Sequence, residues 1–255
     1  PETGKGWRAM AVAVRRVAFI GLMLALMLAG SLLFAGASGP AEQAQGAPPG
    51  APGDPAPAGN IPAGAGDRAV RYEIALGEAK ALYRVGETLI GNNRFGYAVG
   101  MTDDVRGTLY LDPADLRTLR VETVYVNIYK LRSNNPQRDE AIRTRWLESQ
   151  RFPVAEFVPQ SIQGLPETYE AGSEIPVDVV GLLKVRDVEQ PVRFAGVLTV
   201  TEGELKGLFQ ARVLMTSFGF NPPSVLGVLR AENEVDLFLD LTARPATQDA
   251  GGPAR

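Results

Sequence analysis

The sequence predicts an all-β fold: an antiparallel sandwich or closed barrel with one short helix, preceded by an N-terminal apolar helix and a disordered linker. Apolar and β-branched residues alternate with polar ones in many runs between residues 67 and 244, as in half-buried strands. Gly, Pro and Asp clusters separate these runs. Only one stretch in this region, near residue 136, has the start and stop signals of a helix. Alternation alone does not distinguish a sandwich from a barrel.

The composition excludes several classes of chemistry. The 255-residue chain has 26 basic and 29 acidic residues, a net charge of -3, and neither cysteine nor histidine. A nucleic-acid-binding protein usually has a basic excess, so we expect no nucleic-acid partner. Without cysteine or histidine there is no disulfide, thiolate site or Ser-His-Asp triad. We therefore expect no cofactor and no metal, although a carboxylate site for a hard metal or for glycoside chemistry stays open.

The N-terminal segment, residues 1–37, predicts export or anchoring. Basic residues precede an uncharged apolar run at 17–35, and no basic residue follows it until Arg68. As a helix this run would span about 28 Å, close to the hydrocarbon thickness of a bilayer. The positive-inside rule then places the rest of the chain outside the cytoplasm, in the periplasm or at the cell surface. A cleaved signal peptide ending near Ala35-Gly36-Ala37 and a retained membrane anchor remain alternatives.

Two further segments have too little apolar content to fold. Residues 38–66 are rich in Pro, Ala and Gly, and residues 245–255 have a similar composition. Such segments cannot bury enough apolar surface to offset the entropy of ordering. We expect a linker at 38–66, a folded domain at 67–244 and a disordered tail at 245–255.

Alternation predicts nine strands in the folded domain. In the run from Arg120 to Leu131, Val124, Val126 and Ile128 share one face. In the run from Glu234 to Thr242, Val235, Leu237, Leu239 and Leu241 share one face. The predicted strands lie near residues 80–85, 94–101, 105–111, 120–131, 154–162, 177–185, 192–201, 204–215 and 234–242.

One helix is predicted at 136–149. Asn134 or Asn135 can cap it, Pro136 suits its first turn, and Pro153 follows its end. Ile142, Trp146 and Leu147 should face the body of the domain.

Four pieces of the domain, in order, resemble the YceI-like family of polyisoprenoid-binding proteins. VGMTDDVRGTLYLD resembles a hairpin of the family through Gly100, Gly107 and Asp112. The stretch that begins LRSNNPQRDEAIRTRWLESQRFPVAEF resembles its signature through Arg138-Asp139, Trp146-Leu147, Phe152-Pro153 and Phe157. VVGLLKVRDVEQPVRF and SFGF resemble two later segments, although Asp187 stands where the family usually has a turn glycine. Because this chain has no histidine, family roles that need a ring nitrogen, including metal binding, are not carried over.

The resemblance implies an eight-stranded lipocalin-like barrel with an apolar lumen, an isoprenoid or other long-chain lipid as partner, and an extracytoplasmic location. An isoprenoid tail makes no hydrogen bonds, so its site needs only apolar side chains and the exclusion of water. The expected lining residues are Leu109, Leu111, Val124, Val126, Ile128, Phe157, Leu183, Phe209, Val213, Leu237 and Leu239.

Charged candidates are weaker. A phosphorylated head group would favour arginine, and Arg138 and Arg143 on the helix are the candidates, with Arg145 beside them. Arg138 also has a structural interpretation, as the partner of a strand carboxylate. We interpret Asp103-Asp104 as simple turn residues rather than a metal or acid–base pair, and Phe218-Gly219-Phe220 as a bend that closes the barrel.

These observations favour a non-enzymatic, extracytoplasmic lipid carrier whose N-terminal segment contacts the membrane. Two alternatives stay open. An enzyme would need polar groups converging inside the lumen, and alternation places none there. A surface adhesion or assembly module would have a solid core, no ligand and an exposed aromatic patch, for which Tyr125 and Tyr129 are the best candidates. A homodimer is compatible with either interpretation.

Overall fold

The computed structural model describes residues 68–225 and 228–246. The predicted N-terminal segment, linker and most of the tail lie outside these residues, and their boundaries stay predictions. The strands are β1 (Val70–Ile74), β2 (Lys80–Leu89), β3 (Arg94–Thr102), β4 (Val105–Arg106), β5 (Thr108–Asp112), β6 (Asp115–Val121), β7 (Val124–Asn127), β8 (Arg132–Ser133), β9 (Val154–Gln163), β10 (Glu174–Val185), β11 (Val188–Thr201), β12 (Glu204–Leu214), β13 (Ser224–Val225) and β14 (Leu229–Pro245). Helical elements are η1 (Ile90–Asn92), η2 (Ile128–Lys130), α2 (Pro136–Ala141), η3 (Ile142–Trp146) and η4 (Met215–Phe218).

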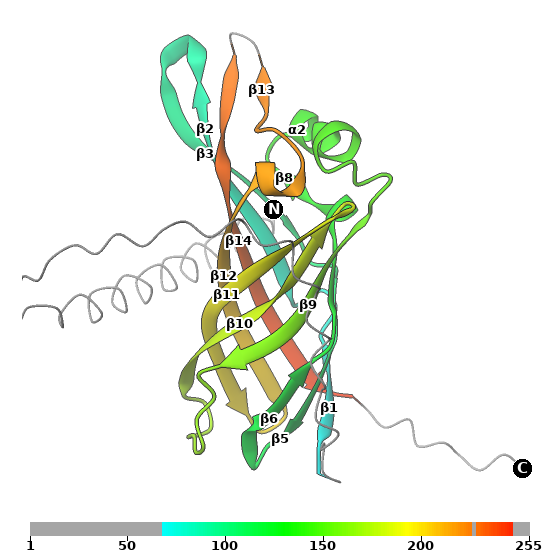
Figure 1. Ribbon diagram of the computed structural model, residues 1–255, viewed down its shortest axis with the longest axis vertical. Coiled ribbons are helices and arrows are strands. Elements are labelled where there is room, and N and C mark those ends of the chain that lie inside the picture. The colour runs from blue at the N-terminus through cyan, green and yellow to red at the C-terminus, as the bar shows by residue number, and fades with distance from the viewer. Residues whose placement is uncertain (1–67, 226–227, 247–255) are drawn as a thin grey trace, which may run out of the picture. The chain divides into compact units, whose positions relative to one another are not determined.

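All the described strands belong to one strongly curled antiparallel sheet (Figure 1). Its long wall runs in the order β7-β9-β10-β11-β12-β14, and each neighbour in this series is hydrogen-bonded. β14 is the longest of the described strands. It pairs with β2 along its first part and with β1 at its C-terminal end. The prediction of a mostly β, antiparallel domain with one helix is confirmed.

The chain between residues 94 and 112 pairs on both of its sides. On one side β3 pairs with β2, and β5 pairs with β1. On the other side β3 pairs with β8, β4 with β7, and β5 with β6. The β4–β7 ladder has only two residue pairs, Val105 with Val126 and Arg106 with Tyr125. This two-pair ladder is here called the seam. It joins the β2–β3 and β5–β6 hairpins, here called the front hairpins, to the long wall.

Asp104 reinforces the seam. Its carboxylate accepts hydrogen bonds from Arg106 Nε at 3.0 Å and Asn127 Nδ2 at 3.1 Å, and it lies 2.8 Å from Lys130 Nζ. Its backbone carbonyl accepts from the Asn127 N–H at 2.9 Å. The interpretation of Asp104 as a simple turn residue was wrong, because its side chain is buried and binds the segment that follows β7.

Several predicted elements differ in the structure; the run at 105–111, for example, is divided into β4 and β5. The run at 120–131 is not one strand: β6 ends at Val121, and β7 gives way to η2 at Ile128. The break occurs because the chain changes partner there, from β5 to β4 and β9, which alternation cannot reveal. The helix begins at Pro136 as predicted, with Asn135 as its cap, but ends at Trp146 after a π-helical turn.

β2 and β14 extend beyond their predicted ends, at the end of the sheet where the β2–β3 and β13–β14 hairpins project (Figure 1). β2 continues to Leu89 and β14 starts at Leu229, with a register shift between Ala231 and Val235. Gly86 lies at this shift, where an added Cβ would come within 2.2 Å of the Glu232 carboxylate. The alternation signal fails here because the irregular residues interrupt the period of two.

We expect Asp104→Asn to weaken the fold in a pH-dependent way. The Lys130 ammonium, followed by Arg106 and Asn127, lowers the pKa of Asp104 to about 2, below its value of about 3.9 in an unfolded chain. This stabilisation is complete above about pH 5 and is lost as the pH falls toward 2. Because both cations are more than half exposed, the variant should lose about 1–2 kcal/mol at pH 7.

Denaturant unfolding of the two proteins between pH 7 and pH 2 measures this difference. Asp103→Asn is the matched control, because Asp103 is the exposed neighbour. A gap between wild type and Asp104→Asn that did not shrink on acidification would contradict the assignment.

Candidate functional site: an apolar cavity in the curled sheet

A cavity of about 470 Å³ lies against the inner face of the curled sheet. Side chains of β2, β7, β9, β10, β12 and β14 line it, because alternation turns every second residue of these strands toward the same space. Its volume lies within the range usual for small-molecule sites, about 300–1,000 Å³. Eight predicted lining residues do line it: Val124, Val126, Ile128, Phe157, Leu183, Val213, Leu237 and Leu239.

The other three predicted residues lie elsewhere. Leu109 and Phe209 line a second pocket of about 60 Å³, and Leu111 is fully buried in the core without lining either space. Phe157 and Phe194 border both spaces. Their rings pack edge to face with centroids 5.0 Å apart. This aromatic pair therefore lies at the boundary between the cavity and the smaller pocket, together with Val124 and Leu239, which also border both.

Helix α2–η3 and the turn after β12 add lining residues that strand alternation could not identify. Ile142, Trp146 and Leu147 line the cavity, in agreement with the prediction that they face the body of the domain. Phe218 and Phe220 also line it, on either side of Gly219, whose φ of 76° produces the bend. Further lining residues missed from sequence are Ala81, Leu82, Tyr83, Val85, Ala98, Leu131, Ala141, Ala155, Val185, Phe194, Met215, Pro223, Val225, Val228, Leu229, Ala231, Val235 and Phe238.

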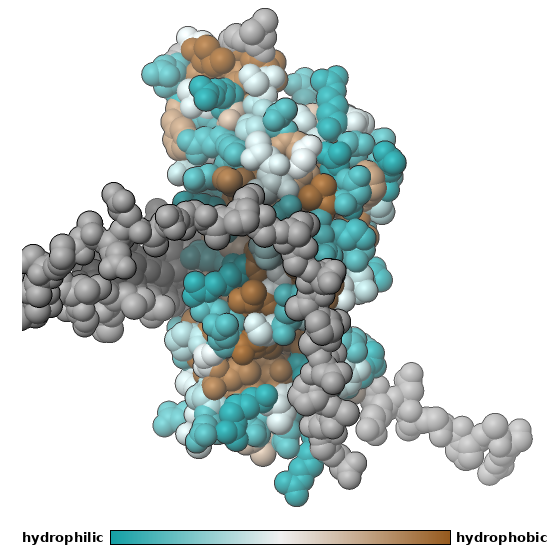
Figure 2. Space-filling view, in the orientation of Figure 1, coloured by the Kyte–Doolittle hydropathy of each residue, from teal (hydrophilic) through white to brown (hydrophobic). Residues whose placement is uncertain are grey.

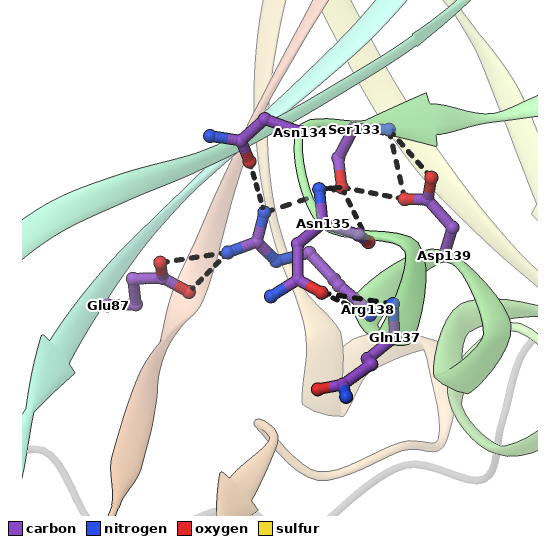
Figure 3. Close-up of polar contacts among 7 residues, drawn as sticks. All are labelled: Glu87, Ser133, Asn134, Asn135, Gln137, Arg138 and Asp139. Carbon is purple, nitrogen blue, oxygen red and sulfur yellow. Dashed lines mark hydrogen bonds and ion pairs between the residues drawn. The ribbon is translucent and has the colours of Figure 1, made fainter.

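The charged lining residues come from β2 and the helix. They are Glu87, Arg138 and Arg145. Arg138 Nη2 donates to both carboxylate oxygens of Glu87, at 2.9 and 3.2 Å, as Figure 3 shows. Only 13% of the Arg138 side chain and 17% of the Glu87 side chain are exposed. The prediction that Arg138 pairs with a strand carboxylate is confirmed, and its charge is already balanced.

The start of the helix is fixed by a polar network beside this ion pair (Figure 3). The Asn135 side chain accepts from the backbone N–H groups of Gln137 and Arg138, as an N-cap does. The buried Asp139 carboxylate accepts from the Ser133 N–H at 2.9 Å and from its hydroxyl at 2.6 Å. These contacts tie the helix to β8 and hold Arg138 in place against β2.

The two remaining helix arginines occupy different positions. Arg143 does not line the cavity; its Nε donates to the Tyr129 carbonyl and its guanidinium lies over the Tyr129 ring. Arg145 lines the cavity, and among the described residues it has no ion-pair partner. Of the helix arginines, Arg145 is therefore the one whose charge is available to a bound anion.

Tyr83 contributes a neutral polar group to the lining. Its ring lies against Gly100, where an added Cβ would be 2.4 Å from the ring. Its hydroxyl is buried and has no hydrogen-bond partner within the described part of the chain. Burial raises the pKa of Tyr83 to about 12, so the hydroxyl stays protonated.

The cavity offers hydrophobic burial with a few polar groups near the helix. Within the described ranges there is no cluster of three or more potential metal-ligating side chains. None of the described helices has the length and apolar character needed to cross a bilayer; the apolar run at 17–35 lies outside the described residues.

Comparison with known proteins agrees with this architecture. The sequence pattern of the YceI-like domain matches residues 86–243. BcnA from Burkholderia cenocepacia has a similar structure: TM-score 0.51, 14% identity, with 66% of this chain and 98% of BcnA covered. A polyisoprenoid binding domain from Saccharophagus degradans gives a TM-score of 0.52 at 9% identity, with 69% of this chain and 99% of that domain covered. Among curated protein sequences there is no significant match. The family pattern spans most of the chain, and the chain therefore belongs to the YceI-like family.

Proposed function

We propose that this protein binds the chain of an isoprenoid, or of a similar long amphiphile, in its apolar cavity and carries or sequesters it outside the cytoplasm. The cavity itself is the observation on which the proposal rests. It is large, bordered mainly by aliphatic and aromatic side chains, and polar chiefly near helix α2–η3. The structurally similar domain from Saccharophagus degradans is a polyisoprenoid binding domain.

The binding energy would come from apolar burial. Each methylene removed from water contributes about 0.8 kcal/mol, so a chain of several isoprene units needs no polar contact for tight binding. Apolar lining side chains such as Leu183 and Leu237 form no hydrogen bonds with water, so a bound chain breaks none when it displaces water from them. Selectivity would then depend on the length and width of the apolar chain.

The head group would lie near the helix. Arg138 is neutralised by Glu87, so Arg145 would supply the positive charge for an anionic head group. The protonated Tyr83 hydroxyl is a hydrogen-bond donor for a carbonyl or alcohol oxygen that enters the cavity.

The proposal includes a closed, eight-stranded barrel as the container. It is supported by the pairing of the chain at 94–112 on both of its sides, which leaves the seam to join the front hairpins to the long wall. A closed barrel of about eight strands can hold one ligand and has no exposed edge.

Location follows from the N-terminal sequence. The basic residues before the apolar run at 17–35 favour a cytoplasmic N-terminus and an external folded domain. A lipid carrier at this position would work next to the membrane that contains its ligand. The solid-core adhesion module is not favoured, because a cavity of about 470 Å³ is present.

Val126→Phe should fill part of the cavity and lower the affinity for a polyprenyl phosphate at least tenfold. Val126 is a lining residue, and the added ring occupies space that the ligand needs. Tyr125→Phe is the matched control, because Tyr125 is the next residue of the same strand and is 45% exposed on the other face.

Titration with a fluorescent polyprenyl phosphate measures both affinities, and circular dichroism checks that both variants fold. Equal affinities in two folded variants would show that the ligand does not occupy this cavity.

Phe194→Ala should change which chain length binds best. Removing the Phe194 ring takes away part of the boundary between the two spaces, so the cavity should join the smaller pocket. The variant should lose about 3–5 kcal/mol of stability but shift its preference toward longer prenols. Competition binding with prenols of increasing length measures how affinity depends on chain length. If the length that binds best did not change, the aromatic pair would not determine the preferred length.

A further inference from the structure

The end of the sheet beside the helix carries a group of exposed apolar side chains, here called the apolar tip. Its members are Leu89, Ile90, Phe95 and Tyr97 of the β2–β3 hairpin, and Val225 and Val228 of the β13–β14 hairpin. Between 38% and 57% of each of these residues is exposed. The two hairpins are adjacent, because Leu89 of β2 pairs with Leu229 of β14. Figure 1 shows both hairpins projecting from the same end of the sheet, and Figure 2 shows hydrophobic side chains at that end.

The two faces of the β2–β3 hairpin carry different parts of the tip. Phe95 and Tyr97 lie on one face, with ring centroids 5.2 Å apart and at right angles to within 8°. The Arg84 guanidinium lies over the Tyr97 ring and pairs with Asp236, which connects this face to β14. Leu89 and Leu229 pair across the neighbouring strands. An aromatic pair of this kind is not needed for the core, which lies further along the strands.

The charged residues within the two stretches that form the tip are basic, and the nearest acidic residues, Glu87 and Glu232, flank these stretches. The stretches 88–97 and 219–231 of the sequence contain no acidic residue, and their only charged residues are Arg94 and Arg230. Exposed aliphatic and aromatic side chains with basic residues and no acid suit the interface of an anionic bilayer. A polar protein surface would not remove the four large apolar side chains of the β2–β3 hairpin from water, whereas a bilayer interface would.

The tip is continuous with the cavity. Val225 and Val228 belong to the tip and also line the cavity, and Leu229 lines it beside them. Apolar surface therefore runs from the outside of the hairpins to the inside of the cavity. A hydrocarbon chain that moved along it would stay out of water over this path.

We propose that the apolar tip inserts into the interfacial region of a lipid bilayer and places the cavity entrance there, so that the ligand is exchanged directly with the membrane. This rests on the proposed lipid-binding function and adds the surface by which loading occurs. The 32 residues at 36–67, between the apolar run and the described domain, could span at most about 110 Å. An anchored domain can therefore turn its tip toward the membrane that holds it.

The absence of cysteine from the chain permits a direct test. A single cysteine at Ile90 or Phe95, labelled with an environment-sensitive fluorophore, reports on the tip of the full chain reconstituted in vesicles of phosphatidylcholine and phosphatidylglycerol. Glu202, exposed in the turn between β11 and β12, is the control position. We expect a blue shift and quenching by nitroxide-labelled lipids at both tip positions and neither effect at Glu202. Tip labels that remain in water would overturn the inference.

A second arm measures loading. The double variant Ile90→Asp/Phe95→Asp should take up a fluorescent prenol from donor vesicles at least tenfold more slowly than wild type, but reach the same final occupancy, because neither residue lines the cavity. Leu76→Asp is the control, since Leu76 is 58% exposed outside the tip. An unchanged rate in the double variant would overturn the inference.

The two arms separate this inference from the proposed function. If no protein takes up the prenol, the proposed function fails, and lipid quenching alone decides whether the tip inserts. If the tip labels shift equally without vesicles and the protein sediments as a dimer, a second copy covers the tip and the inference is wrong.

Discussion

The seam between β4 and β7 has only two residue pairs, and Asp104 reinforces it. A ladder as short as β4–β7 supplies few backbone hydrogen bonds. The Asp104 carboxylate adds contacts to Arg106, Asn127 and Lys130 across the same junction. The cavity depends on this junction, because Val126 of the seam also lines the cavity. Polar side chains thus reinforce this short ladder without lining the cavity.

The distribution of polar groups around the cavity follows the same logic. An unpaired charge inside an apolar space is costly, and Glu87, the only acidic lining residue in the part of the chain that the structure describes, is paired with Arg138. The N-cap of α2 and the buried Asp139 hold Arg138 in this position. The ion pair thus lies in the cavity lining beside the helix, and Phe157 and Phe194 lie where the cavity borders the smaller pocket. Between them the lining is almost entirely apolar.

The sequence predicted the inner faces of the strands better than the ends of the strands. Val124, Val126 and Ile128 line the cavity as alternation indicated, because the period of two survives even where β7 passes into η2. The break in that strand was not predictable, since it arises from a change of partner and not from local propensity. Leu111 shows the opposite limit: its position in the pattern is that of a lining residue, but surrounding side chains fill the space beside it. The role of Asp104 was missed because two of its partners are distant in the chain: Asn127, 23 residues away, and Lys130 beyond it.

The proposal that the cavity holds a lipid is tested most directly by native mass spectrometry of the full chain purified from its native cells, followed by organic extraction of what co-purifies. We predict a discrete added mass, and extraction should recover a molecule with a polyprenyl or similar long chain, because the cavity is large and lined mainly by apolar side chains. A bare protein mass that stayed unchanged after incubation with isoprenoid lipids would contradict the proposal that the cavity binds a long-chain lipid.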